Sequence, residues 1–342
     1  MKPTSEFTLG VDLAQESFVA SLCAAPGDAG RWREQPTAAI AAPPDSPQGV
    51  EALCDWLAVQ QTAAPGRCAR VVVESTGQLS HRFARALAAR GGLPRVAIIN
   101  PRRSKAFGVS LGVRDKSDDV DARVLALYGA VRRVEPAPPR APAQQRVRDL
   151  SRLREDYVQD LLRWQNRRRE TTEDADRRQI DRTIRHLQQE IARRERASAH
   201  VVRQDPALAQ QVRALKKIRG IKQITALTLT AELGDLTRYR RGELTAAAGL
   251  FPKRFESGSS VYRKPRLAKG GGGRLRRVLY MCATSLFRSK GALRGHIDRL
   301  QERGLSDMSI EGALMRKLLL IARAVVKNAG RYDETKICRQ SG

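Results

Sequence analysis

The chain has 342 residues and carries 63 lysines and arginines against 36 aspartates and glutamates, a formal net charge of +27 at pH 7. This excess indicates a polyanionic partner, although a merely soluble basic protein is an alternative, and the length allows two or three domains. No apolar run approaches the ~20 residues of a membrane span, and the start lacks the apolar core of a signal peptide. Five scattered cysteines and four dispersed histidines argue against a disulfide framework or a zinc site, so we expect a cytoplasmic protein.

Residues 1–134 are predicted to form a mixed α/β domain. Short strands rich in β-branched and aromatic residues are expected at 7–11, 18–23, 70–73 and 96–99. The Pro-, Ala- and Gly-rich stretch 24–47 indicates loops with room for one more strand. Helical spacing occurs at 49–60, at 79–89 and from 118 to about 132. Strands alternating with helices favour a sheet covered by helices on both faces.

A proline-rich linker is predicted at 135–145, because each proline removes a backbone donor and restricts the residue before it. Residues 146–203 contain no glycine or proline, and apolar side chains recur there at three- and four-residue steps. This pattern predicts a helical hairpin or coiled coil. Its charged outer face is either a solvated surface or part of a dimerisation arm.

The remaining segment, 204–342, is predicted to be mostly helical and to make most phosphate contacts, because residues 201–342 hold +19 of the net charge. Within it, 215–227 resembles half of a helix-hairpin-helix element, whose tight turn would offer backbone N–H groups to a phosphate. Lys222 stands where that element would have its second glycine. An ordinary pair of packed helices is the alternative interpretation.

Four acidic residues suggest a catalytic site. Asp12 and Glu74 each end an apolar run, while Asp118 and Asp121 lie three residues apart on a predicted helix and therefore share a face. Asp119 points elsewhere. RNase H-like folds hold two divalent metal ions for phosphodiester chemistry with carboxylates in this order, and Mg²⁺ or Mn²⁺ suits an all-oxygen site. Taken singly, each carboxylate has the alternative interpretation of a surface residue.

A second candidate site surrounds the serine- and glycine-rich passage from 255 to 274. Small residues let a backbone approach phosphate closely, and the flanking cations would neutralise it. A serine here is a candidate phosphate ligand or nucleophile, with no histidine nearby to act as its base, and a flexible polar loop is the alternative. The expected nucleic-acid-binding residues are Lys253, Arg254, Arg263, Lys264, Arg266, Lys269, Arg274, Arg276 and Arg277.

Seven short motifs, in order along almost the whole chain, resemble the DEDD-type insertion-sequence transposases, a family that includes bridge-RNA-guided recombinases and pilin-gene invertases. They are Gly10-Val-Asp12, Val73-Glu-Ser-Thr-Gly77, Asn100-Pro101, Lys116-Ser-Asp-Asp-Val-Asp-Ala-Arg123, Ala247-Ala-Gly-Leu250, Phe255-Glu-Ser-Gly-Ser-Ser260 and Leu275-Arg-Arg-Val-Leu-Tyr280. Gln15, where a lysine is expected, departs from the family pattern without touching the proposed catalytic set.

The resemblance implies an RNase H-like, RuvC-like domain at 1–134, a coiled-coil connector at 146–203 and a mostly α transposase domain at 204–342 with a catalytic serine. It implies two Mg²⁺ or Mn²⁺ ions per active site, a transient 5′-phosphoserine link to DNA, and an active site completed by a partner subunit of a homodimer or homotetramer. Matched residue by residue, the metal ligands are Asp12, Glu74, Asp118 and Asp121, and the nucleophile is Ser257, with Ser259 and Ser260 less favoured.

The predicted function is therefore that of a DNA recombinase of an insertion sequence, acting on donor and target DNA. The resemblance further implies guidance by a structured noncoding bridge RNA and work at the nucleoid of a bacterial cytoplasm. Two alternatives remain. One is a RuvC-like junction endonuclease that hydrolyses DNA without a serine intermediate. The other is a nonenzymatic nucleic-acid-binding protein with a decayed metal site.

Overall fold

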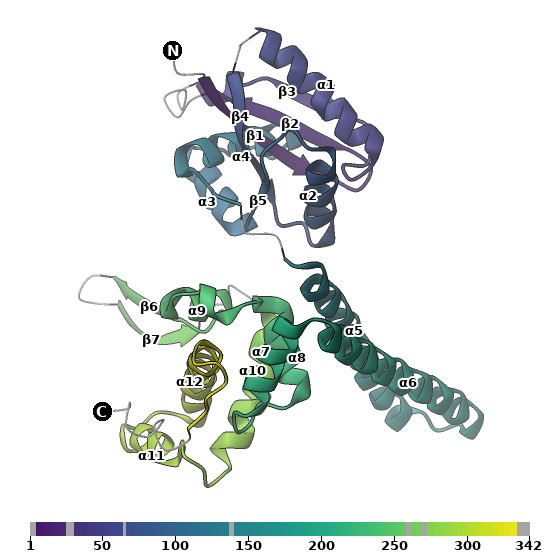
Figure 1. Cartoon of the computed structure of the whole chain (residues 1–342), viewed down its shortest axis with the longest axis vertical. Helices are drawn as coiled ribbons and strands as arrows, with labels where there is room; N and C mark the ends of the chain where they lie inside the picture. Colours follow the sequence, from purple (N-terminus) through teal and green to yellow (C-terminus); the bar gives the residue numbers. More distant parts are fainter. Residues whose placement is uncertain are drawn as a thin grey trace. The chain divides into compact units, whose positions relative to one another are not determined.

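The computed structural model describes residues 5–24, 31–63, 66–136, 140–257, 261–267 and 272–333, and not the side chains of Ser5, 252–257 and 261–266. The chain divides into two compact units, 1–139 and 140–342 (Figure 1). Among the described residues, no cluster of buried apolar side chains contains members of both units. Each unit therefore has its own core, and each is described separately.

The first unit contains a five-stranded sheet in the order β3-β2-β1-β4-β5. Strands β1, β2 and β3 are antiparallel neighbours, whereas β4 and β5 run parallel to β1. The parallel strands therefore bring their carboxyl ends to the same edge of the sheet. The strands are β1 (Ser5–Leu13), β2 (Phe18–Cys23), β3 (Thr37–Ile40), β4 (Gly66–Glu74) and β5 (Val96–Ile99).

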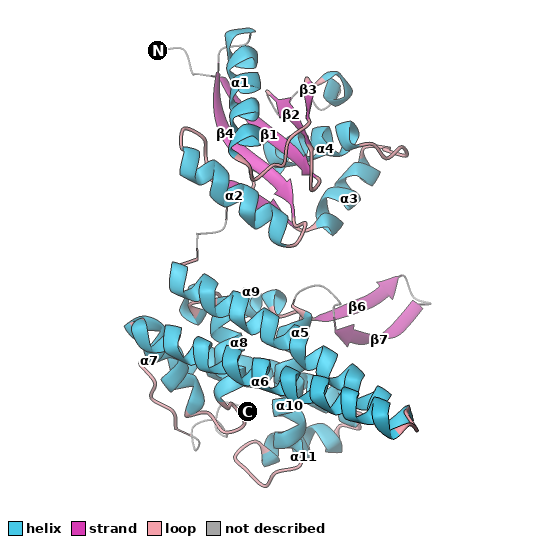
Figure 2. Ribbon diagram, turned by 90° about the vertical axis from the view of Figure 1, so that its right-hand side faces the viewer, coloured by secondary structure: helices cyan, strands magenta, loops and turns pink. Residues whose placement is uncertain are grey.

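Helices cover both faces of this sheet, as the alternating pattern predicts (Figure 2). One face packs against α1 and α2 through side chains such as Val11, Val73, Leu53 and Phe83. The other face packs against α4, with α3 beside it. The helices are α1 (Pro47–Ala63), α2 (Gln78–Arg90), α3 (Pro101–Ser110) and α4 (Asp118–Arg132).

Helix α3 differs from the sequence analysis, which predicts no element at 101–110. Its start is specified locally, because the Asn100 side chain accepts a hydrogen bond from the Arg102 backbone N–H and Pro101 occupies the first turn. Its sequence lacks the apolar repeat of an amphipathic helix. The residues that it buries are Ser104 and Gly108, which are small and not strongly apolar. Capping and burial of small residues thus form a helix where apolar periodicity predicts none.

The second unit begins with two long helices, α5 (Pro142–Glu170) and α6 (Asp174–Gln204), which pack along each other (Figure 1). Helix α5 begins inside the stretch expected to be a linker, because proline is tolerated in the first turn of a helix. None of the described helices is long and apolar enough to cross a bilayer.

The rest of this unit is a helical core with a two-stranded antiparallel ribbon. Its helices are α7 (Pro206–Lys216), α8 (Gln223–Leu233), the 3₁₀ helix η2 (Leu236–Arg238), α9 (Arg241–Ala247), α10 (Gly273–Phe287), α11 (Arg294–Glu302) and α12 (Asp307–Lys327). The ribbon is β6 (Pro252–Ser257) with β7 (Val261–Leu267).

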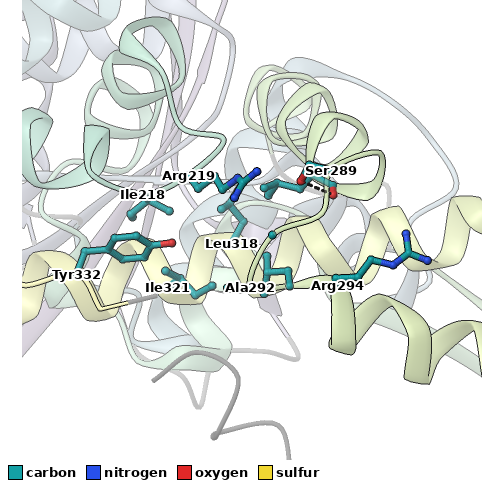
Figure 3. Close-up of a pocket in the computed structure, with 11 residues that line it drawn as sticks. Ile218, Arg219, Ser289, Ala292, Arg294, Leu318, Ile321 and Tyr332 are labelled. Carbon is teal, nitrogen blue, oxygen red and sulfur yellow. Dashed lines mark hydrogen bonds between the residues drawn. The ribbon is translucent and has the colours of Figure 1, made fainter. Parts of the chain in front are cut away.

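The turn between α7 and α8 packs into this core. Ile218 and Ile221 are buried, and Figure 3 shows Ile218 and Arg219 beside Leu318 of α12. The cavity drawn there has a volume of about 10 Å³, room for roughly one water molecule. The apolar side chains of this turn thus belong to the core, which is compatible with both interpretations of 215–227.

Candidate active site

Two of the four candidate carboxylates lie at one edge of the sheet in the first unit. Val11 of β1 pairs with Val73 of β4, so Asp12 and Glu74 are the next residues on these neighbouring parallel strands. Val11 and Val73 belong to the core on the α1–α2 side. Because successive strand residues face opposite sides, Asp12 and Glu74 project toward the face that α4 covers.

Helix α4 brings the other two carboxylates to this edge. It packs closely on β1 because Gly10 has no side chain: a Cβ atom there would lie 2.2 Å from the Ala126 backbone nitrogen and 2.4 Å from the Ala122 oxygen. Asp118 begins the helix, and Ser117 caps it by accepting from the Val120 N–H.

The neighbouring Asp119 faces away from this cluster. Its carboxylate accepts a hydrogen bond of 3.4 Å from the Thr37 hydroxyl of β3. This is the orientation that the helical spacing predicts.

The four carboxylates influence one another electrostatically. Burial raises the pKa of Asp12 to about 6, and the charges of Asp121, Asp118 and Glu74 add to the effect. Burial also raises the pKa of Asp121, with Glu74 and Asp118 contributing and Lys116 opposing. The structure therefore brings Asp12, Glu74, Asp118 and Asp121 into one acidic cluster.

Ser104 of α3 is a member of this site that the sequence analysis missed. It is buried, and its hydroxyl lies within hydrogen-bonding distance of Glu74 Oε1 and of the Pro101 carbonyl oxygen. The proton can go to one acceptor at a time, and the charged carboxylate is the stronger one. The sequence offers one weak signal for Ser104: it follows the Asn100-Pro101 helix start and lies between Arg103 and Lys105.

The donor set fits a hard divalent cation, because it consists of carboxylate oxygens whose charges repel one another. A bound cation would remove that repulsion. In the arrangement seen here, no three His, Cys, Asp or Glu side chains of the described ranges are placed to hold a metal ion. The carboxylates are thus chemically suited to a divalent cation, while their positions among the described residues do not form a metal site.

The second candidate site lies in the other unit. Ser257 is the last residue of β6 and pairs with Val261, but its side chain is outside the described residues. Ser259, Ser260 and Lys269 are also outside them, as are the side chains of Lys253, Arg254, Arg263, Lys264 and Arg266.

The candidate arginines of α10 are described. Arg274 forms an ion pair of 3.2 Å with Asp156 of α5, and Arg277 pairs with Glu155 of the same helix. Arg276 lies between them in the sequence and is partly buried. In this structure, two of the predicted nucleic-acid-binding arginines therefore contact carboxylates of the hairpin.

Comparison with known proteins defines the class. A family model described as a transposase, of the DEDD type of IS110, matches residues 9–174, and a model described as transposase IS116/IS110/IS902 family matches 212–297. Together these ranges contain the acidic cluster and Ser257. The chain belongs to the IS110-type DEDD transposases.

Two curated relatives agree with this membership. They are pilin gene-inverting proteins of Moraxella bovis and Moraxella lacunata, and each is 28% identical to this chain over 242 residues. The aligned part covers 70% of this chain and 75% of each relative.

Proposed function

We propose that this protein cuts and rejoins DNA as the recombinase of an insertion sequence, using the acidic cluster of the first unit and Ser257 of the second. The observation that carries the proposal is the gathering of four carboxylates from β1, β4 and α4 at one edge of the sheet, in a chain that belongs to a transposase family. The strand order and the placement of acids at strand ends support an RNase H-like, RuvC-like assignment for this unit.

The acidic cluster is proposed to hold two Mg²⁺ or Mn²⁺ ions through Asp12, Glu74, Asp118 and Asp121. When bound, such ions activate an attacking oxygen and stabilise a leaving one in phosphoryl transfer. The chain itself contributes the converging carboxylates and the Ser104 hydroxyl beside Glu74.

Ser257 is the proposed nucleophile. Its hydroxyl oxygen forms a bond to the phosphorus of a DNA phosphodiester, the hydroxyl proton is lost, and the bond from phosphorus to the 3′ oxygen breaks. The freed 3′ oxygen takes up a proton, and a 5′-phosphoserine link remains. Attack by another 3′ hydroxyl reverses these changes and restores Ser257. The link conserves the phosphodiester bond energy, so strands are exchanged without ATP.

The proposed partners are donor and target DNA and a structured noncoding RNA that pairs with both. The two Moraxella relatives are named for inverting a pilin gene, and the net charge of +27 on this chain suits nucleic-acid backbones. Base pairing by an RNA would supply sequence choice that backbone contacts do not. The α5–α6 hairpin is the proposed contact in a homodimer or homotetramer.

The test is recombination between donor and target plasmids in cells that express the protein with its flanking noncoding DNA. Ser257→Ala and Asp121→Ala should each abolish joining. Asp119→Asn is the matched control, because Asp119 faces Thr37 rather than the cluster, and it should retain activity. Recombination by Ser257→Ala would instead favour the metal-dependent junction endonuclease or a neighbouring serine. Normal DNA binding without any joining would favour the nonenzymatic binding protein.

A further inference from the structure

Helix α3 has two faces of opposite character. Its buried face carries Ser104, which contacts Glu74, and Gly108, which packs against Val124 of α4. Its exposed face carries Arg102, Arg103 and Lys105. An α-helix rises about 1.5 Å per residue, so the three cations lie within about 3 Å, along the axis, of the residue that contacts Glu74.

These three cations have no acidic partner in the part of the chain that the structure describes. Among the described side chains, no carboxylate forms an ion pair with Arg102, Arg103 or Lys105. On α2, by contrast, Arg82 pairs with Asp45 and Arg90 with Glu51. Unpaired cations on a solvated helix face are available to a ligand phosphate.

The cations of α3 can offset the electrostatic repulsion between the acidic cluster and DNA phosphates. Without bound metal, the four carboxylates repel a phosphate backbone, so a DNA strand that approaches this edge needs positive charge beside it. Helix α3 supplies that charge.

We propose that the exposed face of α3, formed by Arg102, Arg103 and Lys105, binds the phosphate backbone of duplex DNA next to the acidic cluster. The buried Ser104 of the same helix ties this contact in position to Glu74. This inference deepens the proposed function by assigning a DNA-binding site in the first unit, apart from the cations of β6, β7 and α10. It requires DNA binding there but not catalysis.

The test is the affinity of the full chain for a duplex oligonucleotide, measured by fluorescence anisotropy in EDTA over a range of salt concentrations. The variant Arg102→Gln/Arg103→Gln/Lys105→Gln should bind roughly tenfold or more weakly at about 0.15 M salt, and its log–log salt slope should fall by about 3. The matched control, Arg85→Gln/Arg90→Gln/Arg95→Gln, removes the same charge from exposed arginines on α2 and just before β5. It should stay within about twofold of wild type.

Equal affinities of the two triple variants for duplex DNA would overturn the proposal. It would also be overturned if the α3 variant lost affinity only for a single-stranded RNA oligonucleotide measured in the same way. If the triple variant does not fold, Arg103→Gln alone should lower the slope by about 1, and an unchanged slope would be decisive against it. Because EDTA prevents catalysis, the outcome is independent of the proposed reaction. A chain that binds DNA through α3 but never recombines would refute the proposed function and leave this inference standing.

Discussion

The Glu74 carboxylate accepts a hydrogen bond from the buried hydroxyl of Ser104. Ser104→Ala would leave Glu74 without this donor, so Mn²⁺ affinity should fall roughly 10-fold, as is usual when a group that orients a metal ligand is removed. Titration calorimetry measures this directly. Ser104→Thr keeps the hydroxyl and should recover part of the affinity. Ser110→Ala, which removes an exposed hydroxyl of the same helix, is the control; equal affinities of the two alanine variants would contradict a positioning role.

Asp12 is a carboxylate whose charged form the folded protein disfavours. Its pKa is raised from 3.8 to about 6, so the folded state binds more protons than the unfolded state between these values, and stability falls as pH rises through that window. Without metal, Asp12→Asn should raise the free energy of unfolding at pH 7.5 by on the order of 2 kcal/mol. The gain should vanish near pH 4. Urea titrations in EDTA would test this, and an Asp12→Asn variant without added stability at pH 7.5 would contradict it.

At the scale of elements, the contact between β1 and α4 decides whether the carboxylates meet. Gly10→Ala would place a methyl group into the α4 backbone, which should cost about 1–3 kcal/mol or more and move Asp118 and Asp121 away from Asp12. Gly108→Ala adds the same methyl group at ordinary contact distances of 3.7 Å and more. Thermal unfolding should therefore show a large loss for Gly10→Ala and a small change for Gly108→Ala. Similar losses in both would contradict the proposed close approach.

The ion pairs between α5 and α10 form another contact with functional consequences. Asp156 and Glu155 hold Arg274 and Arg277, so they compete with any phosphate for these arginines. Glu155→Gln/Asp156→Asn should raise affinity for duplex DNA several-fold at low salt, with a smaller gain at high salt because screening weakens both contacts. Glu170→Gln/Asp174→Asn, at the far end of the hairpin, is a charge-matched control. If the Glu155→Gln/Asp156→Asn variant bound DNA no more tightly than the control variant, α10 would not be a DNA-binding element.

The elements that could be predicted from the sequence were those with a regular pattern of apolar residues. Strand patterns and the helical spacing after Asp118 predicted the bounds of β1, β2, β5 and α4 to within a few residues. The position of acidic residues at strand ends pointed to the acidic cluster. Helix α3 and Ser104 could not be found this way. The bond from Ser104 to Glu74 spans 30 residues and belongs to no local motif, so only the folded chain reveals it.

At the scale of the whole molecule, the two proposed catalytic groups belong to different compact units. The acidic cluster lies in residues 1–139, and Ser257 lies in residues 140–342. The proposed reaction needs both units, since neither the carboxylates nor the serine would conserve the DNA bond alone.

Capture of the covalent intermediate tests most directly whether Ser257 is the nucleophile. The protein would be incubated with Mg²⁺ and a nicked DNA substrate that cannot religate, denatured, and digested for mass spectrometry. The expected result is a DNA phosphate attached to the peptide that contains Ser257, and this adduct should be absent from Ser257→Ala and from Asp121→Asn. Cleaved DNA with no attached protein, or an adduct that persists in Ser257→Ala, would contradict it.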